Sequence, residues 1–286
     1  MMKNPTLIVT AILLFIGVST LFSISPLHAQ SAGSCHPVAR SNHSFMRVAG
    51  PADLNLIQAQ NTVSIRYLSH ASFRLISPEG VHIATDFTGF NGTAGLPDIA
   101  TMNTIHDGHF TFEPDERIPQ VLQGWAADGV AAEHHLRLGD TIIRNVPTDF
   151  TTEATGFRPA ENSIFVFEIA GLCIGHLGHL HQYPTDDEIA QIGRLDVMMA
   201  QIGGISPLSI DQINSLTKRL GARIVIPMHW GFDPELHSYL DQARRFFKIE
   251  GHNHNAVDVS ILTLPTDPTM LVLTPETSFG LFRDQP

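Results

Sequence analysis

Polar and apolar residues alternate along much of the chain beyond residue 60, and this is the period of a half-buried β-strand. The clearest case is residues 63–87, where two alternating runs flank the turn sequence Ser-Pro-Glu-Gly and predict a hairpin. The same pattern, interrupted by a loop that contains Trp125, predicts one more strand and two more hairpin-like pieces over residues 98–103, 134–149 and 163–178.

The pattern changes after residue 184. Thr185 and Glu188 have the spacing of a capping box, which predicts the start of a short helix. A second helix is predicted from Ser209 to Gly221, because its apolar residues form one stripe: Ile210, Ile213, Leu216 and Leu220. Continuous apolar runs over 195–203 and 222–229 predict buried strands on either side of that helix. This strand–helix–strand unit places His229 at the carboxyl end of its last strand, where open sheets carry their ligands.

The N-terminus has the pattern of an export signal. Lys3 precedes an apolar run over 6–24, and Pro26 and Ala29 then supply a helix breaker and a small residue for cleavage. We predict a signal peptide over 1–29, an N-terminal extension of the mature chain over 30–60 and one domain over 61–286, in a periplasmic or secreted protein without an integral membrane domain. The alternative is a retained membrane anchor, because the apolar run is about long enough to span a bilayer.

Composition narrows the choice of partners. The formal charge of −11 on 286 residues disfavours nucleic acid and anionic membrane surfaces, which are bound through clusters of Lys and Arg that this sequence lacks. We therefore expect a small-molecule substrate, while the sequence leaves the oligomeric state open. Cys35 and Cys173 could pair in an oxidising compartment. However, Cys173 lies inside an apolar strand, and two distant cysteines do not make a disulfide framework, so we predict two free thiols.

Histidine is unusually frequent, with 16 residues against 17 Lys and Arg together. Five of them follow predicted strands: His106, His109, His176, His179 and His229. A neutral imidazole offers a metal one lone pair, and an ion needs several such donors held by rigid elements. Any one of these histidines alone could equally be hydrogen-bonded to a backbone carbonyl, but five at strand ends predict a metal site.

Several segments resemble a known family. YLSHASFRL, IATDF, TMNTIHDGH, ENSIFVFEIAGLCIGHLGHLH, DVMMAQIGG and IVIPMHW occur in the order and spacing of the metallo-β-lactamase fold hydrolases, in the branch that includes ascorbate-6-phosphate lactonase-like proteins. The resemblance covers about residues 61–232. It implies an α/β (α+β) fold, a four-layer αββα sandwich with a metal site at one edge. It also implies a hydrolase whose metal-bound hydroxide attacks an ester, lactone, amide or phosphodiester bond.

The metal-binding motif departs from the family pattern at two places. The family's His-x-His-x-Asp-His loop is matched by Thr104-Ile-His106-Asp-Gly108-His109, so the first His is Thr and the Asp is Gly. After the histidine matching His176, the usual Leu-Gly-Asp is Leu-Gly-His179, which removes the carboxylate that bridges two metals. The resemblance implies ligands at His106, His109, His176, His179 and His229. It favours one zinc ion over two, and other divalent transition metals, such as iron, nickel, copper and manganese, remain open.

Three further residues are candidate catalytic groups. Asp107 lies one position from the usual Asp of the loop, and Asp86 is expected to hold a ligand imidazole through a hydrogen bond. His70 matches a family histidine near the site, where it either binds substrate or donates a proton, or is a strand histidine hydrogen-bonded across the hairpin. Because the binding loop and the bridging position both depart from the family's ligands, a non-catalytic metal-binding or sensing protein on the same scaffold stays the alternative to a hydrolase.

Overall fold

The computed structural model of the chain describes residue 35 and residues 61–93, 95–152, 156–204, 207–231, 233–251 and 253–277. These residues belong to one compact unit, Gly33–Pro286. The predicted signal peptide over 1–29 lies outside the described residues, and so does the predicted extension over 30–60 except for Cys35. Within the described ranges, no helix is both long and apolar enough to cross a membrane.

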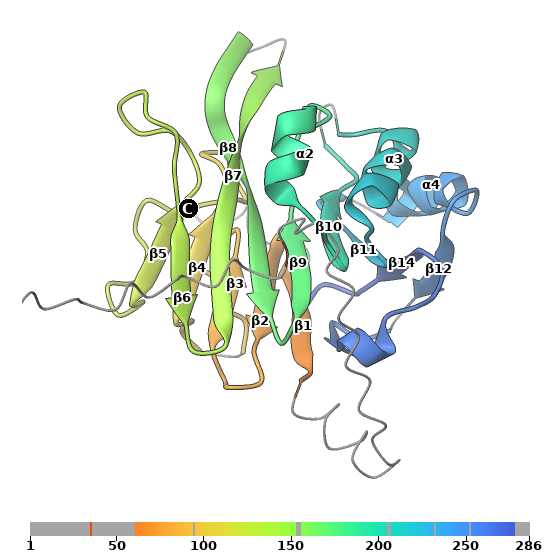
Figure 1. The fold of residues 1–286 in the computed structure, drawn as a ribbon, viewed down its shortest axis with the longest axis horizontal. Coiled ribbons are helices and arrows are strands. Elements are labelled where there is room, and N and C mark those ends of the chain that lie inside the picture. Colours follow the sequence, from red (N-terminus) through yellow and green to blue (C-terminus); the bar gives the residue numbers. More distant parts are fainter. Residues whose placement is uncertain are drawn as a thin grey trace, which may run out of the picture. The chain divides into compact units, whose positions relative to one another are not determined.

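Two β-sheets stack face to face in the described part of the chain (Figure 1). The six-stranded sheet has the order β13-β1-β2-β3-β4-β5 and consists of β1 (Val63–Ser69), β2 (Ser72–Ile76), β3 (His82–Thr85), β4 (Ile99–Met102), β5 (Gln120–Gln123) and β13 (Ala256–Val259). The eight-stranded sheet has the order β12-β14-β11-β10-β9-β8-β7-β6 and consists of β6 (His135–Leu138), β7 (Thr141–Thr152), β8 (Gly156–Ile169), β9 (Leu172–His176), β10 (Val197–Gln201), β11 (Ile224–Met228), β12 (Lys248–Gly251) and β14 (Thr269–Val272).

Each sheet contains a parallel block. Strands β3, β4 and β5 run parallel in the first sheet. Strands β9, β10, β11, β14 and β12 run parallel in the second, and the other pairs are antiparallel. Parallel strands deliver their carboxyl ends to the same edge of a sheet, so loops that follow them lie together.

The core between the sheets follows from the two-residue period of the strands. Phe73 and Ile83 of the first sheet lie in one apolar cluster with Phe165, Phe167 and Ile226 of the second. The residues in between point to the opposite faces, as the pleat requires. The sequence alternation that predicted half-buried strands therefore produces the central layer of this fold.

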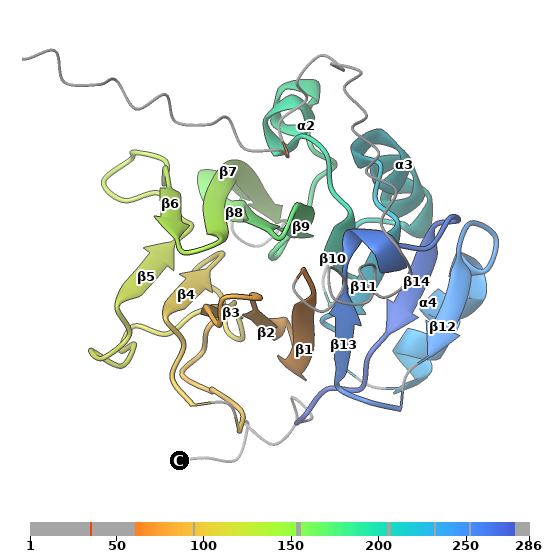
Figure 2. The ribbon, with the colours of Figure 1, turned by 60° about the horizontal axis from the view of Figure 1, so that its bottom comes forward.

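Helices cover the outer face of the eight-stranded sheet (Figure 2). They are α2 (Asp186–Ile192), α3 (Ile210–Leu220) and α4 (Asp233–Ala243), and a 3₁₀ turn, η1 (Ile261–Thr263), lies near the chain's end. The outer face of the six-stranded sheet is covered, among the described residues, by loops that contribute Phe87, Ile118 and Trp125. The predicted two-sheet α/β sandwich is confirmed, and among the described residues its helices lie on one outer face while loops cover the other.

Most of the predicted elements match the structure. Thr185 accepts a hydrogen bond from the Glu188 amide in a complete capping box, and α3 buries the predicted apolar stripe. The β8–β9 turn falls at Ala170 and Gly171, which have φ of 52° and 78°, as a type I′ hairpin requires. Strand β5 and the four elements α4, β12, β13 and β14 are additions that the sequence pattern did not predict.

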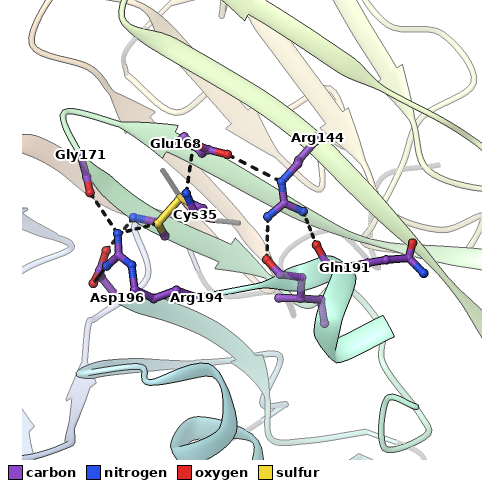
Figure 3. The surroundings of a disulfide bond; sticks show 9 residues. Cys35, Arg144, Glu168, Gly171, Gln191, Arg194 and Asp196 are labelled. Atoms are coloured by element: carbon purple, nitrogen blue, oxygen red, sulfur yellow. Dashed lines mark hydrogen bonds and ion pairs between the residues drawn. A yellow bond between two sulfur atoms is a disulfide. The ribbon is translucent and has the colours of Figure 1, made fainter. Parts of the chain in front are cut away.

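The prediction of two free thiols is wrong, because Cys35 and Cys173 form a disulfide with their Cα atoms 5.6 Å apart (Figure 3). Cys173 lies on the face of β9 that points towards the helices, and residue 35 reaches the same cluster. The backbone of Cys35 is held on both sides, since its N–H donates to Glu168 Oε2 at 3.4 Å and its carbonyl accepts from the Arg194 N–H at 2.9 Å. The Glu168 carboxylate also pairs with buried Arg144 at 3.7 Å.

Candidate metal centre

The candidate site lies where strands of both sheets end. It is formed by side chains that follow β1, β3, β4, β9 and β11: His70, Asp86, His106, His109, His179 and His229. Three of them have positive φ, namely 44° at His70, 41° at Asp86 and 66° at His229. Non-glycine residues rarely adopt this conformation, and it clusters at functional sites in proteins. The chain therefore turns sharply at these strand ends to aim the side chains at one place.

The imidazoles form two overlapping groups of possible ligands, which together make up the imidazole cluster. One group is His70, His109 and His229, and the other is His106, His109 and His179. In each group the ligand atoms lie within 4.8 Å of one another. The structure thus brings together His106, His109, His179 and His229 from the predicted ligand set, and adds His70.

Asp86 orients the histidine that the two groups share. Its Oδ2 lies 2.5 Å from Nδ1 of His109, and its Oδ1 accepts from the Asn103 amide at 3.0 Å. Both Asp86 and His109 are fully buried. Burial raises the pKa of the Asp86 carboxyl to about 7, partly offset by His176 and by the Asn103 amide. Because Nδ1 of His109 is engaged, only its Nε2 can bind a metal.

Three buried imidazole nitrogens in the cluster have no hydrogen-bond partner among the described residues: Nε2 of His109, Nδ1 of His179 and Nε2 of His229. Burial, followed by repulsion from neighbouring histidines, lowers the pKa of His109 and His179. Burial lowers the pKa of His229 to about 4. These rings are neutral at pH 7 and each keeps a lone pair. Such buried, unsatisfied nitrogens fit a transition-metal ion, which would supply the missing partner.

The predicted ligand His176 is placed differently. Its Nε2 lies 2.8 Å from the Ala71 carbonyl, and its Nδ1 accepts from the Gly178 amide at 3.1 Å. This pair of contacts assigns the proton to Nε2 and leaves no lone pair for a metal. The ring is fully buried and lies edge-on to Phe73, with ring centroids 5.9 Å apart. As a ligand, His176 stays a prediction that these hydrogen bonds do not favour.

Two asparagines that the sequence did not single out position the loop after β9. Asn162 Oδ1 accepts from the His179 amide at 3.0 Å, and Asn103 Nδ2 donates to the Ser163 carbonyl at 2.6 Å and to the His176 carbonyl at 3.4 Å. Gly178 passes between these side chains with φ of 62°, and a Cβ there would lie 2.5 Å from Asn162 Oδ1. Only glycine fits this position, so the Leu-Gly-His turn fixes where His179 points.

A cleft of about 1030 Å³ opens beside the imidazole cluster, and His70, His106 and His229 form part of its lining. Asp107 also lines the cleft and is exposed. Its carbonyl lies 3.1 Å from Nδ1 of His106, which is exposed as well. The predicted catalytic residues therefore occupy three different places: His70 among the imidazoles, Asp86 behind His109, and Asp107 at the open side.

Residues 64–229 match the family model described as the β-lactamase superfamily domain. The chain is 23% identical over 196 residues to a UPF0173 metal-dependent hydrolase from Methanoculleus marisnigri, covering 63% of this chain and 87% of that protein.

Solved structures show the same fold. A Zn-dependent hydrolase of the metallo-β-lactamase superfamily from Thermotoga maritima superposes with a TM-score of 0.53 at 21% identity, over 74% of this chain and 98% of that chain. The diiron β-hydroxylase CmlA from Streptomyces venezuelae superposes with a TM-score of 0.51 at 14% identity, over 70% of this chain and 54% of that chain. With the family model covering more than half of its length, the chain belongs to the β-lactamase superfamily.

Proposed function

We propose that the protein is a metal-dependent hydrolase that holds one divalent transition-metal ion, with zinc favoured, in its imidazole cluster. The observation that carries this proposal is a set of buried imidazole nitrogens, on His109, His179 and His229, that have no hydrogen-bond partner among the described residues. They belong to two groups of possible ligands that share His109. Imidazole suits zinc as well as iron, nickel and copper, so the donor type supports a transition metal rather than calcium or magnesium.

The donor geometry supports one ion rather than two. Both ligand groups depend on His109, and its single available nitrogen cannot serve two ions at once. A carboxylate oxygen can bridge two metals, but the family position that carries it is His179 in this chain. The described groups therefore favour a single ion, with His70, His106, His179 and His229 as the remaining donors around His109.

A bound divalent ion lowers the pKa of water and polarises the bond that is to be hydrolysed. The chain's own residues prepare that chemistry. Asp86 fixes the ring of His109 and its tautomer, which is the usual role of a carboxylate behind a ligand histidine. His70 and His229 also line the cleft, so two of the proposed donors border the space open to a substrate, while the Asp107 carboxylate at the open side is placed to accept a proton. The name of the Methanoculleus relative, a metal-dependent hydrolase, supports this proposal. The lactonase-like branch stays a prediction.

We also propose export to the periplasm or the cell exterior. The disulfide between Cys35 and Cys173 supports this proposal, because disulfides persist in oxidising compartments and are rare in the cytosol. N-terminal sequencing of protein from the cell envelope tests it. We expect a mature chain that begins near Gln30, whereas only full-length protein in membranes would favour the anchor.

Metal analysis of single variants tests the site. We expect His109→Ala and His229→Ala to lose most of the bound metal, while His176→Ala keeps it if folded, because the rings of only the first two offer a nitrogen to the cluster. His237→Ala is the matched control, since His237 is exposed on α4. Equal metal content in all variants would place the ion elsewhere.

Activity is tested with a panel of chromogenic esters, lactones, amides and phosphodiesters, with and without a chelator. We expect turnover that the chelator abolishes and added zinc restores. A metal-loaded protein that is inert to the whole panel would favour a metal-binding or sensing role instead.

A further inference from the structure

The cleft beside the imidazole cluster has an aromatic wall. Phe90 comes from the loop between β3 and β4, and Phe110 and Phe112 come from the loop between β4 and β5. All three line the same cleft as His70 and His229. An apolar surface therefore begins directly next to the proposed metal ligands.

This aromatic wall packs against the buried Trp125 and also presents a ring to solvent. The rings of Phe110 and Phe112 meet edge to face with centroids 4.6 Å apart, and Phe110 meets Trp125 in the same way at 5.8 Å. Trp125 is buried, whereas the side chain of Phe112 is 77% exposed. A phenylalanine that is held in place by its neighbours and still exposed to water is suited to contact an apolar ligand.

Apart from the proposed ion, the described residues around the cleft offer no cation to an anionic substrate. Among the described residues that line the cleft there is no lysine or arginine, and the charged group present is the Asp107 carboxylate. The one cation of segment 104–119 is Arg117, and it is paired with Asp115 at 2.7 Å. Arginine or lysine commonly helps to hold phosphate oxygens, whereas the Asp107 carboxylate in the lining of this cleft would repel them.

We propose that the cleft binds uncharged carboxylic esters, lactones included, and packs their apolar acyl group against Phe110 and Phe112. This inference rests on the proposed function, in which the imidazole cluster supports hydrolysis. In the reaction the oxygen of water bonds to the acyl carbon, and the bond from that carbon to the leaving oxygen breaks. One proton of water ends on that oxygen, so that the products are a carboxylic acid and an alcohol, which are parts of one hydroxy acid when the substrate is a lactone.

Hydrolysis of matched substrates by the zinc-loaded, disulfide-bonded protein tests the inference. We expect kcat/KM to rise at least about tenfold from p-nitrophenyl acetate to p-nitrophenyl butyrate, because each added methylene gains apolar contact. Turnover of bis(p-nitrophenyl) phosphate should be lower than that of either ester. A phosphodiester preference, or equal rates for the two esters, would overturn the inference and leave the proposed hydrolase intact.

Single variants in the aromatic wall test whether Phe112 causes the chain-length preference. Phe112→Ala should lower kcat/KM for the butyrate ester about tenfold more than for the acetate ester, so that the chain-length preference is lost. The matched control is Phe157→Ala, because Phe157 is also largely exposed, at 65%, but lies on β8 and is not among the cleft residues. A preference that survives in Phe112→Ala would contradict the inference.

A binding measurement separates this inference from the proposed function. 4-Phenyl-2-butanone is uncharged and cannot be hydrolysed, and its affinity for the chelator-treated protein can be measured by calorimetry. We expect saturable binding that Phe112→Ala weakens several-fold and Phe157→Ala does not change. This result, together with a zinc-loaded protein that turns over no ester, lactone, amide or phosphodiester of the panel, would overturn the proposed function and keep the apolar cleft. Absence of binding to the wild-type protein would overturn the proposal that the cleft binds apolar groups.

Discussion

The substitution Asp86→Asn tests how the site holds its central histidine. Asp86 is fully buried and serves two donors, the ring of His109 at 2.5 Å and the Asn103 amide at 3.0 Å. An asparagine keeps one acceptor oxygen and puts an NH₂ group in place of the other. One of the two donors then faces another donor, and an unsatisfied buried group of this kind costs about 1–3 kcal/mol of folding stability.

The same substitution should weaken metal binding by an amount similar to its cost in folding stability. Loss of a carboxylate behind a ligand histidine typically lowers metal affinity about 10–100-fold, which corresponds to about 1.4–2.8 kcal/mol of binding free energy. Competition with a chromogenic chelator measures the affinity, and denaturant unfolding of the metal-free protein measures the stability. Asp128→Asn is the control, because Asp128 is exposed. Unchanged zinc affinity in a folded Asp86→Asn protein would refute the role assigned to Asp86.

Three other measurements test the site and its surroundings. His179→Asp restores the bridging group of the family and should raise zinc content from about one towards two ions per chain by elemental analysis; two tightly bound ions in the wild type would contradict the single-ion proposal. In the metal-free protein, burial holds the pKa of His70 at about 2 and that of His229 at about 4. As the pH falls, the unfolded chain therefore takes up protons before the folded protein does. The free energy of unfolding should have its full value above pH 6.5 and should fall, for each of these two histidines, by about 1.4 kcal/mol per pH unit between pH 6.5 and 4. A flat profile in denaturant titrations would refute this. Reduction of the disulfide, or Cys173→Ser, should lower unfolding stability by about 2–5 kcal/mol, and equal unfolding midpoints with and without reductant would show that the bond does not stabilise the fold.

The strand-end histidines could be predicted from the sequence because the alternation of apolar residues shows where strands end. His106, His109, His179 and His229 were found in this way, and the structure brings them together. The elements after residue 232 escaped the same reasoning. Strands β12, β13 and β14 have four residues each, which is too short for alternation to stand out. Their place in the sheets is set by tertiary pairing rather than by local pattern.

The hydrogen bonds of His176 and the place of His70 among the imidazoles could not be predicted, because they depend on contacts between distant parts of the chain. His176 is satisfied by the carbonyl of Ala71, far away in sequence, and the alternatives left open for His70 differ only in where its ring points. The disulfide has the same origin. Residue identity and spacing gave no sign that Cys35 would reach the outer face of β9, where Cys173 lies.

The proposed ligands are contributed by both sheets, and this determines when the protein can acquire its metal. His70 and His109 follow strands of one sheet and His229 follows a strand of the other, so the donors meet only after the two sheets have packed. An unfolded chain offers scattered imidazoles and no preformed site. If the chain is exported before it folds, it meets its metal outside the cytoplasm. The ion that it carries would then reflect the supply of metals in that compartment, rather than selection by the ligands alone.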